Sequence, residues 1–480
     1  MKKTLLFLSA LLCTWVTNAQ LKPKTIIPTG NYIGVKYLDI SPDEKYMITL
    51  CGSEVNLWEI ASGTPITTFQ SKESNMDVTR FSPDGKHVIT GAISPSGIGT
   101  VLELWDLETQ KLVRDFRAED GYGSSFCFSP DSKLIACSGA NGKVFIYDLQ
   151  TGTLKSSFKG KGSAKTIQFF PDGNHMLMSG IGGGYVFDIK SGNMVTELDV
   201  EQTSSGEDIA ISSDGKWILL AAGEDIVLFD AKTFDQSRVF KGHLENVRSV
   251  NFSPDLQSFV STSYDGTVKV WDLRSGEQKV SMSSGIKVGE VRAEINKFYD
   301  GVSGITEYAK YSPDGKRIYV GVGDGSIQVF NSLTGARERT FKSPVVSFDH
   351  LFYDDKAKNL YTRLRKSNQA KSFNILSGKI ESVGVRDDLR WDKLKVTTGT
   401  TDMMVSYYKN SVYFYENQKF AGKLFFIGEK DWVFFRDEFY DGSPVGISTC
   451  FKLNGLTTTK LNSKSDPQYK PGLLKQIFKL

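Results

Sequence analysis

Residues 241–280 read KGHLENVRSVNFSPDLQSFVSTSYDGTVKVWDLRSGEQKV, and this stretch decides the fold. Three runs within it, VRSVNF, SFVST and TVKVWDL, alternate with the period of two that is typical of β-strands. The pairs Pro254-Asp255 and Asp265-Gly266 separate these runs, and both are residue types that form tight turns. The stretch therefore predicts a small antiparallel sheet built from successive hairpins.

The same unit recurs along the chain, and an aromatic residue marks the third run of each copy. Neighbouring aromatics are 40 to 47 residues apart, except for a gap of 59 residues between Trp271 and Phe330. A turn of the type SPDG stands upstream of most copies and begins at residues 41, 82, 129, 170, 212, 253 and 312. Two signals in phase predict repeated small sheets that bury their faces against their neighbours. The aromatics are Trp58, Trp105, Tyr147, Phe187, Phe229, Trp271, Phe330, Phe373 and Tyr415.

Gly242-His243 at the start of the 241–280 unit and Trp271-Asp272 near its end resemble the signature of a WD repeat. The resemblance implies a β-propeller. It also implies a hydrogen-bonded set of a His, a Ser or Thr, an Asp and the Trp that ties neighbouring strands together. The matching positions here are His243, Ser261 or Ser263, Asp265 and Trp271, and we expect their role to be structural.

The predicted fold is all-β, with a single WD-repeat propeller over residues 20–422. Nine aromatics favour eight or nine four-stranded blades, and seven, the usual number in the family, is the alternative. Residues 25–27 are expected to be an outer strand that completes the final blade, which would hide an open sheet edge. Residues 423–480 are expected to form a C-terminal extension with short strands, a polar linker and a terminal helix.

Residues 1–19 have the layout of a secretory signal peptide. Lys2-Lys3 is followed by an apolar stretch from Thr4 to Val16, which is too short to span a bilayer, and Ala19 is the expected cleavage site. The predicted product is exported, periplasmic or extracellular, and has no other stretch that could cross a membrane. A formal net charge of +3 gives no basic footprint for nucleic acid, and a monomeric ring is expected.

Departures from the average repeat fall on one predicted rim of the propeller. Because the strands alternate in direction, the loops after the outer strand and between the second and third strands share that rim. An insertion at 283–305 and further segments at 94–100, 117–123 and 385–392 belong there. Such loops can simply pack on their own scaffold, but their aromatic and arginine residues are of the types enriched where proteins bind each other. The candidate partner-binding residues are Tyr122, Arg292, Tyr299, Arg390 and Trp391.

Three segments near the C-terminus resemble the linker that precedes caspase-like peptidase domains in some bacterial WD-repeat proteins. They are WVFF at 432–435, YDGSP at 440–444 and YKPGLL at 469–474. The peptidase domain that would follow such a linker is not in this sequence. If the resemblance to this linker holds, a separately encoded peptidase is a predicted partner.

The motifs of the common hydrolases and metal sites are missing. The sequence has four His and no HExxH, CxxC or GxSxG motif, so we predict no catalytic residue, no metal and no cofactor. The favoured function is a non-catalytic scaffold for protein–protein contacts. The alternatives are the sensing propeller of a separate caspase-like peptidase, and a propeller hydrolase or lyase with a site in the central channel.

Overall fold

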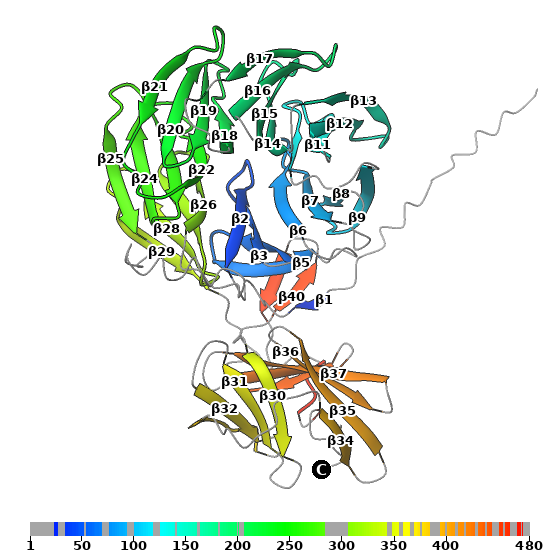
Figure 1. The fold of residues 1–480 in the computed structure, drawn as a ribbon. Helices are drawn as coiled ribbons and strands as arrows, with labels where there is room; N and C mark the ends of the chain where they lie inside the picture. Colours follow the sequence, from blue (N-terminus) through cyan, green and yellow to red (C-terminus); the bar gives the residue numbers. More distant parts are fainter. Residues whose placement is uncertain are drawn as a thin grey trace, which may run out of the picture.

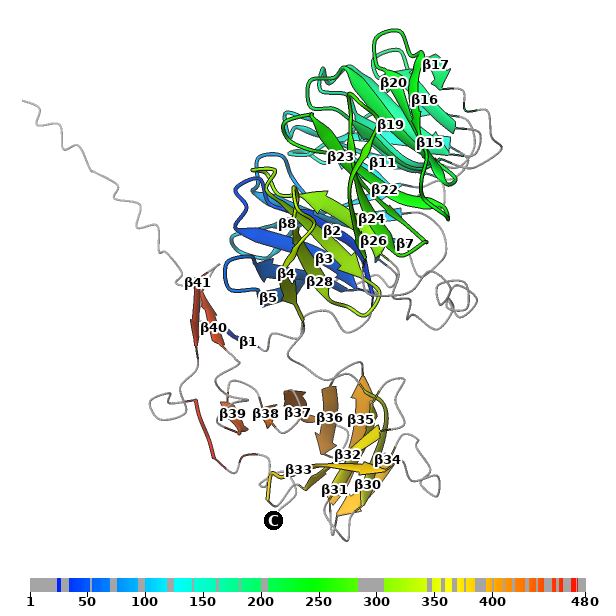
Figure 2. The same cartoon turned by 90° about the vertical axis from the view of Figure 1, so that its left-hand side faces the viewer.

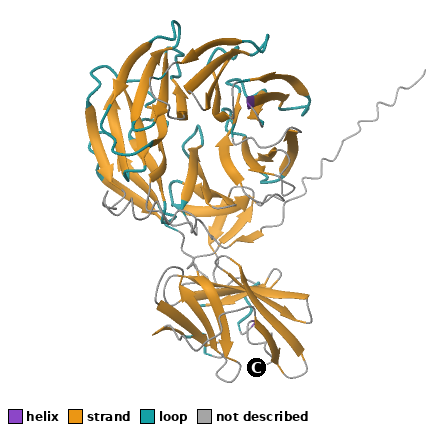
Figure 3. Ribbon diagram, viewed as in Figure 1, coloured by secondary structure: helices purple, strands orange, loops and turns teal. Residues whose placement is uncertain are grey.

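The computed structural model consists almost entirely of β-strands and the turns between them (Figure 3). It confirms the predicted all-β class. The described residues are 24–26, 34–51, 54–69, 76–93, 100–118, 125–139, 142–160, 164–180, 183–198, 200, 206–283, 306–342, 348–354, 359–364, 369–374, 377–384, 394–398, 401–408, 411–416, 419–427, 431–436, 439–443, 451–454, 457–460, 468–471 and 473.

Seven four-stranded antiparallel sheets, which we call blades 1 to 7, follow one another along the chain, each with its strands in sequence order. Blades 1 to 4 comprise β2–β5 (Val35–Ile40, Tyr46–Cys51, Glu54–Glu59, Thr64–Phe69), β6–β9 (Met76–Phe81, His87–Ile93, Thr100–Asp106, Leu112–Ala118), β10–β13 (Phe126–Phe128, Leu134–Ser138, Lys143–Asp148, Leu154–Lys159) and β14–β17 (Ala164–Phe169, His175–Gly180, Gly183–Asp188, Met194–Leu198). Blades 5 to 7 comprise β18–β21 (Gly206–Ile211, Trp217–Ala222, Asp225–Asp230, Gln236–Phe240), β22–β25 (Val247–Phe252, Ser258–Ser263, Thr267–Asp272, Gln278–Ser283) and β26–β29 (Thr306–Tyr311, Arg317–Val322, Ile327–Asn331, Arg337–Phe341).

Hydrophobic clusters fill the interfaces between neighbouring blades. The described residues form seven such clusters, one for each interface of a closed ring. The closing cluster joins Met47 and Trp58 of blade 1 to Tyr319 and Phe341 of blade 7. Residues 35–341 therefore form a closed β-propeller of seven blades (Figure 1). The aromatics of the seven ring repeats all belong to these clusters, which explains their regular spacing.

The last two repeats lie outside the ring, so the predicted range of 20–422 is too long for the propeller. Phe373 and Tyr415 belong to a four-stranded and a six-stranded sheet, and the rings of Phe373 and Trp432 pack with their centroids 5.3 Å apart. The face of blade 1 that an eighth blade would need is already covered by blade 7. Both sheets lie beside the ring in two views (Figure 2). They comprise β30–β33 (Phe348–Asp354, Asn359–Leu364, Gln369–Asn374, Ile380–Gly384) and β34–β39 (Leu394–Thr398, Thr401–Tyr408, Ser411–Glu416, Lys419–Ile427, Asp431–Arg436, Phe439–Gly442).

Two details of the predicted organisation are wrong. The strand expected to complete the last blade, β1 (Lys24–Ile26), pairs with β40 (Phe451–Asn454), which in turn pairs with β41 (Thr457–Lys460). Each ring blade already contains four strands of its own, so no blade needs a strand from elsewhere. The predicted boundary after residue 422 falls inside β37. The predicted terminal helix lies outside the described residues, apart from residues 471 and 473.

The turn between the first and second strands of a blade is held by its Ser and Asp. In blade 6, Ser253 Oγ donates to Asp255 Oδ1 at 2.6 Å, and the same carboxylate oxygen accepts from the Gln257 N–H at 3.0 Å. Ser253 Oγ also accepts from the Ser258 N–H at 3.0 Å. Equivalent bonds form in the turns that begin at Ser41, Ser82, Ser129, Ser212 and Ser312. The Asp thus closes the turn through hydrogen bonds, in addition to tolerating its tight backbone.

The residue after this Asp has a positive φ, which leads to a stability prediction. Gly occupies the position in the turn of blade 5 (Gly215, φ 71°), whereas blade 3 has Ser132 with φ 56°. We expect Ser132→Gly to have a free energy of unfolding about 1 kcal/mol higher than Ser132→Ala, because only glycine adopts this conformation without strain. Urea denaturation of both variants measures the difference. Both lose the hydrogen bond from the Asp84 N–H to Ser132 Oγ, so that bond cancels in the comparison.

Candidate functional site

The five predicted partner-binding residues, Tyr122, Arg292, Tyr299, Arg390 and Trp391, lie outside the described residues. Their role stays a prediction. The residues of the predicted hydrogen-bonded set are all described, and so is the centre of the ring.

The set in blade 6 is a chain of hydrogen bonds. Trp271 Nε1–H donates to Ser261 Oγ at 2.8 Å, and Ser261 Oγ lies 2.7 Å from His243 Nε2. His243 Nδ1 lies 2.9 Å from Asp265 Oδ2. These bonds are satisfied together by a neutral His243 with its proton on Nδ1. Ser263 is not part of the chain, because its hydroxyl donates to the Glu245 carbonyl at 2.7 Å.

Asp265 is the anchor of this chain. Burial raises the pKa of Asp265, but the hydrogen bonds from His243 and Thr267 outweigh burial and hold the pKa well below its usual value. The carboxylate also accepts from the Leu244 N–H at 3.0 Å. Asp265 and His243 are buried, and neither lines the central cavity described next. The arrangement joins strands and offers no reactive group to a substrate.

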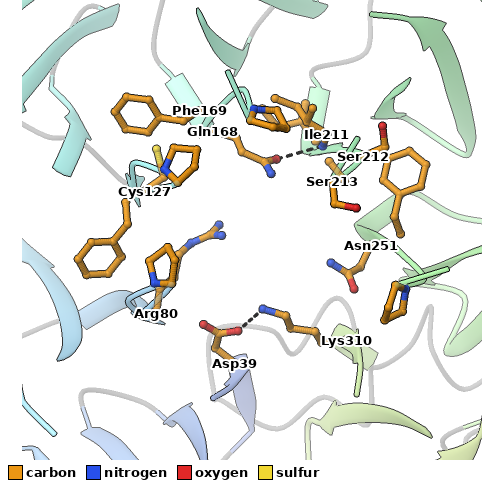
Figure 4. A pocket seen from close by; sticks show the side chains of 18 of the residues that line it. Asp39, Arg80, Cys127, Gln168, Phe169, Ile211, Ser212, Ser213, Asn251 and Lys310 are labelled. Atoms are coloured by element: carbon orange, nitrogen blue, oxygen red, sulfur yellow. Dashed lines mark hydrogen bonds and ion pairs between the residues drawn. The ribbon is translucent and has the colours of Figure 1, made fainter. Parts of the chain in front are cut away.

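A cavity of about 560 Å³ lies at the centre of the ring. It is at the end that carries the turns between first and second strands, and prolines from five of these turns line it: Pro42, Pro83, Pro130, Pro171 and Pro254. This end is opposite the predicted binding rim, because the two sets of loops connect opposite ends of the strands. Each blade contributes to the wall the residue two positions before its turn, namely Asp39, Arg80, Cys127, Gln168, Ala210, Asn251 and Lys310 (Figure 4).

Several of these wall residues bind the backbone of the next blade. Asp39 Oδ2 accepts from the Phe81 N–H at 2.9 Å. Gln168 Oε1 accepts from the Ile211 N–H at 3.2 Å, and Asn251 Oδ1 accepts from the Tyr311 N–H at 3.4 Å. With their oxygens engaged in this way, the amide nitrogens of Gln168 and Asn251 point into the cavity (Figure 4).

Blades 7 and 1 are joined at the cavity by charge and by tyrosines. Lys310 of blade 7 forms an ion pair with Asp39 of blade 1. The hydroxyl oxygens of Tyr37 and Tyr308 are 3.2 Å apart, and the centroids of their rings are 4.3 Å apart. These contacts join blades 7 and 1 next to the cavity, and the hydrophobic cluster that contains Trp58 joins the same two blades.

Arg80 is a cation of the cavity that forms no ion pair with a described carboxylate, although its charge acts on Asp39 and Asp208. Its guanidinium group points into the cavity, and the guanidinium carbon lies 5.5 Å from the centroid of the Tyr37 ring (Figure 4). Its Nε is buried without a hydrogen-bond partner. Within the described part of the chain no carboxylate forms an ion pair with it. An arginine side chain is always charged and has five donors in a fixed fork, so this position favours an anionic group.

Asp208 lies on the same strand as Ala210, deeper in the wall. Its Oδ2 accepts from the Val250 N–H at 3.0 Å. Burial raises its pKa to about 6, although that hydrogen bond and the charge of Arg80 act in the opposite direction. At neutral pH the ring therefore contains a buried, ionised carboxylate, and keeping this charge away from water costs the folded state free energy.

The raised pKa of Asp208 predicts a pH-dependent effect of Asp208→Asn. At a pH between the pKa of Asp208 in the unfolded chain and about 6, Asp208 is protonated in the folded state and ionised in the unfolded state. The contribution of Asp208 to the free energy of unfolding therefore rises as the pH falls through this range. Relative to Asp208→Asn, the wild type should gain about 1 kcal/mol in the free energy of unfolding between about pH 7 and pH 5. Urea denaturation at both pH values measures it. The comparison with the variant is needed because the Asp residues of the turns, such as Asp131 with its lowered pKa, lose stability in acid. A pH-independent difference would contradict the burial of an ionised Asp208.

Among the described residues, the lining of the cavity includes the carboxylates of Asp39 and Asp208 and no histidine. Burial raises the pKa of the Cys127 thiol to about 12, so this sulfur is not a thiolate nucleophile at neutral pH. In the described residues, no group of three or more His, Cys, Asp or Glu side chains could hold a metal ion.

Sequence reasoning missed the cavity residues. A signal was present, since six of the seven residues two positions before the turns are polar or carry a thiol. Only closure of the ring brings these seven positions together.

Comparison with known proteins agrees with the fold. The model of the WD domain, G-beta repeat, matches residues 112–148 and 234–272. The chain is 25% identical over 244 residues to the probable U3 small nucleolar RNA-associated protein 18 of Schizosaccharomyces pombe, covering 47% of this chain and 46% of that protein. It is 25% identical to the serine-threonine kinase receptor-associated protein of Gallus gallus (46% and 61% covered) and 24% identical to a guanine nucleotide-binding protein subunit beta of Nicotiana tabacum (50% and 65%).

The closed ring and these repeats define a WD-repeat β-propeller. The chain spans less than two thirds of the length of each of these curated relatives. Among the described residues, there is no helix with the length and apolar character needed to cross a bilayer.

Proposed function

We propose that this protein is an exported, non-catalytic scaffold for protein–protein contacts. The observation that carries the proposal is the ring itself, in which seven apolar interfaces hold the blades together. A rigid support of this kind presents its loops at a low entropic cost of binding. The names of two relatives, a receptor-associated protein and a subunit of a larger protein, describe association with other proteins. Export rests on the signal peptide predicted for residues 1–19.

The test is affinity capture of partners from the native cell envelope. In the double variant Tyr299→Ala, Trp391→Ala, we expect loss of the captured partner at an unchanged melting temperature, since each anchor can contribute about 2 kcal/mol or more. Leu333→Ala is the matched control, because Leu333 is an exposed apolar side chain (86% accessible) in a turn of blade 7 at the opposite rim. Loss of the partner in Leu333→Ala alone would contradict binding at the predicted rim and would indicate that the opposite rim binds the partner.

A second candidate is the regulatory propeller of a separately encoded caspase-like peptidase. Two of the three linker-like segments pack against each other, which favours a folded docking unit. The Tyr440 N–H donates to the Gln468 carbonyl at 3.1 Å, and the Lys470 N–H donates to the Tyr440 carbonyl at 2.8 Å. The rings of Tyr440 and Tyr469 lie with their centroids 5.7 Å apart.

This candidate is tested with two baits, the full chain and a chain that ends at Lys342. The shorter chain keeps every residue of the seven inter-blade clusters. A peptidase with a Cys–His pair should be captured by the full chain and lost with the shorter one. Equal capture by both baits would exclude docking on the C-terminal sheets.

A further inference from the structure

We propose that the cavity at the centre of the ring binds a carboxylate ligand with an apolar body, and that Arg80 is the group that pairs with its charge. The site lies at the opposite end of the ring from the predicted protein-binding rim and does not depend on it. Three properties of the cavity support the assignment, namely its free hydrogen-bond donors, its charges and its apolar mouth.

The cavity offers donors because its acceptors are engaged by the protein. The carboxylate of Asp39 accepts from the Phe81 N–H and pairs with Lys310, and that of Asp208 accepts from the Val250 N–H. Gln168 and Asn251 likewise use their oxygens on backbone N–H groups of the next blade. The guanidinium of Arg80 and the two amide nitrogens remain directed into the cavity (Figure 4). Such a surface is complementary to an acceptor-only group.

The charges favour a single negative charge in the ligand. Lys310 is neutralised by its ion pair with Asp39. Arg80 forms no ion pair in the described residues, although its charge also acts on Asp208, so its guanidinium group can still pair directly with a ligand. A carboxylate matches the planar fork of a guanidinium with two parallel hydrogen bonds. A dianionic phosphate would bring a second negative charge close to the carboxylates of Asp39 and Asp208, which line the same cavity.

The mouth of the cavity favours an apolar body on the ligand. The five prolines supply the apolar surface at the mouth. Phe81, Phe128, Phe169 and Phe252 also border the cavity, with their side chains packed in the inter-blade clusters. A volume of about 560 Å³ is within the range of sites that bind small molecules. A compact organic acid therefore fits both the wall and the mouth.

The test is isothermal titration calorimetry of the full chain with phenylacetate, its neutral amide phenylacetamide, and inorganic phosphate. We expect phenylacetate to bind with a dissociation constant of about 1 mM or lower, and the amide and phosphate to bind at least about tenfold more weakly. Equal affinity for the acid and the amide, or no binding of the acid, would overturn the proposal. Tighter binding of phosphate than of phenylacetate would overturn the choice of a carboxylate.

Variants locate the site. Arg80→Gln should weaken phenylacetate binding at least about tenfold, since it removes the charge-assisted hydrogen bonds. Asn251→Asp should weaken it similarly, because an oxygen remains for the Tyr311 N–H while a donor becomes an anion. The control Lys133→Gln removes an exposed cation from a turn and should leave the affinity unchanged. If Arg80→Gln does not fold, Asn251→Asp decides. The proposed site would be wrong if Asn251→Asp bound phenylacetate with the affinity of the wild type. It would also be wrong if Lys133→Gln lost as much affinity as Arg80→Gln or Asn251→Asp.

Discussion

Trp58→Ala is expected to lower the free energy of unfolding by about 4 kcal/mol, the largest effect of any single substitution considered. Trp58 is fully buried in the cluster that joins blade 1 to blade 7, and its Nε1–H donates to Thr49 Oγ1 at 2.8 Å. Truncation to alanine removes the largest side chain of the closing cluster and leaves a cavity there. Urea denaturation followed by far-ultraviolet circular dichroism measures the loss.

Trp58→Phe is the matched control for this prediction. It keeps an aromatic ring in the cluster and removes the hydrogen bond to Thr49, so we expect a smaller loss of about 1–2 kcal/mol. Equal losses in the two variants would show that the hydrogen bond, and not the packing of blade 1 on blade 7, dominates. A loss below about 1 kcal/mol in Trp58→Ala would contradict closure at this interface.

Asp265→Ala is expected to lower the free energy of unfolding by about 3 kcal/mol. The substitution leaves His243 Nδ1, the Thr267 hydroxyl and the Leu244 N–H without their shared acceptor, and an unpaired buried donor is costly. His243→Ala should cost about 1–3 kcal/mol, and the double variant should cost less than the sum because both residues act in one chain of hydrogen bonds.

Glu277→Ala, an exposed position in the same blade, serves as the control and should change the free energy of unfolding by less than about 0.5 kcal/mol. If the wild type, His243→Ala and Asp265→Ala had the same melting temperature, the structural role of His243 and Asp265 would be contradicted.

The propeller could be predicted from the sequence because the repeated aromatic is itself an interface residue. Trp105 and Trp271, for example, each pack in the cluster between their own blade and the preceding one. Their spacing therefore measures the distance from blade to blade along the chain. The number of blades in the ring could not be predicted in this way. Phe373 is buried for the same physical reason in a sheet outside the ring, so the pattern continues after the ring has closed.

The misplaced strand shows where local patterns stop being informative. A short run such as residues 25–27 fits the edge of any sheet, and the choice of β40 as the partner of β1 depends on how the distant C-terminal strands fold back. The turns were recognised from Pro, Asp and Gly, but the role of the Ser hydroxyl became visible only from its hydrogen bonds.

The candidate site was the part that sequence reasoning predicted least. Arg80, Asn251 and Gln168 are separated by tens of residues, and each is one of several polar residues in its own strand. Their convergence follows from the equivalence of positions in successive blades once the ring is closed. The rim residues that the sequence suggested, Tyr299 and Trp391 among them, lie outside the described residues and await the capture experiment.

The central claim is that the ring closes between blade 1 and blade 7, and thermal unfolding of the chain that ends at Lys342 tests it most directly. We expect a cooperative transition within about 5 °C of the ring transition in the full chain, because none of the seven described clusters uses a later residue. A shortened chain that is unfolded, or that melts far below the full protein, would contradict a ring of seven blades.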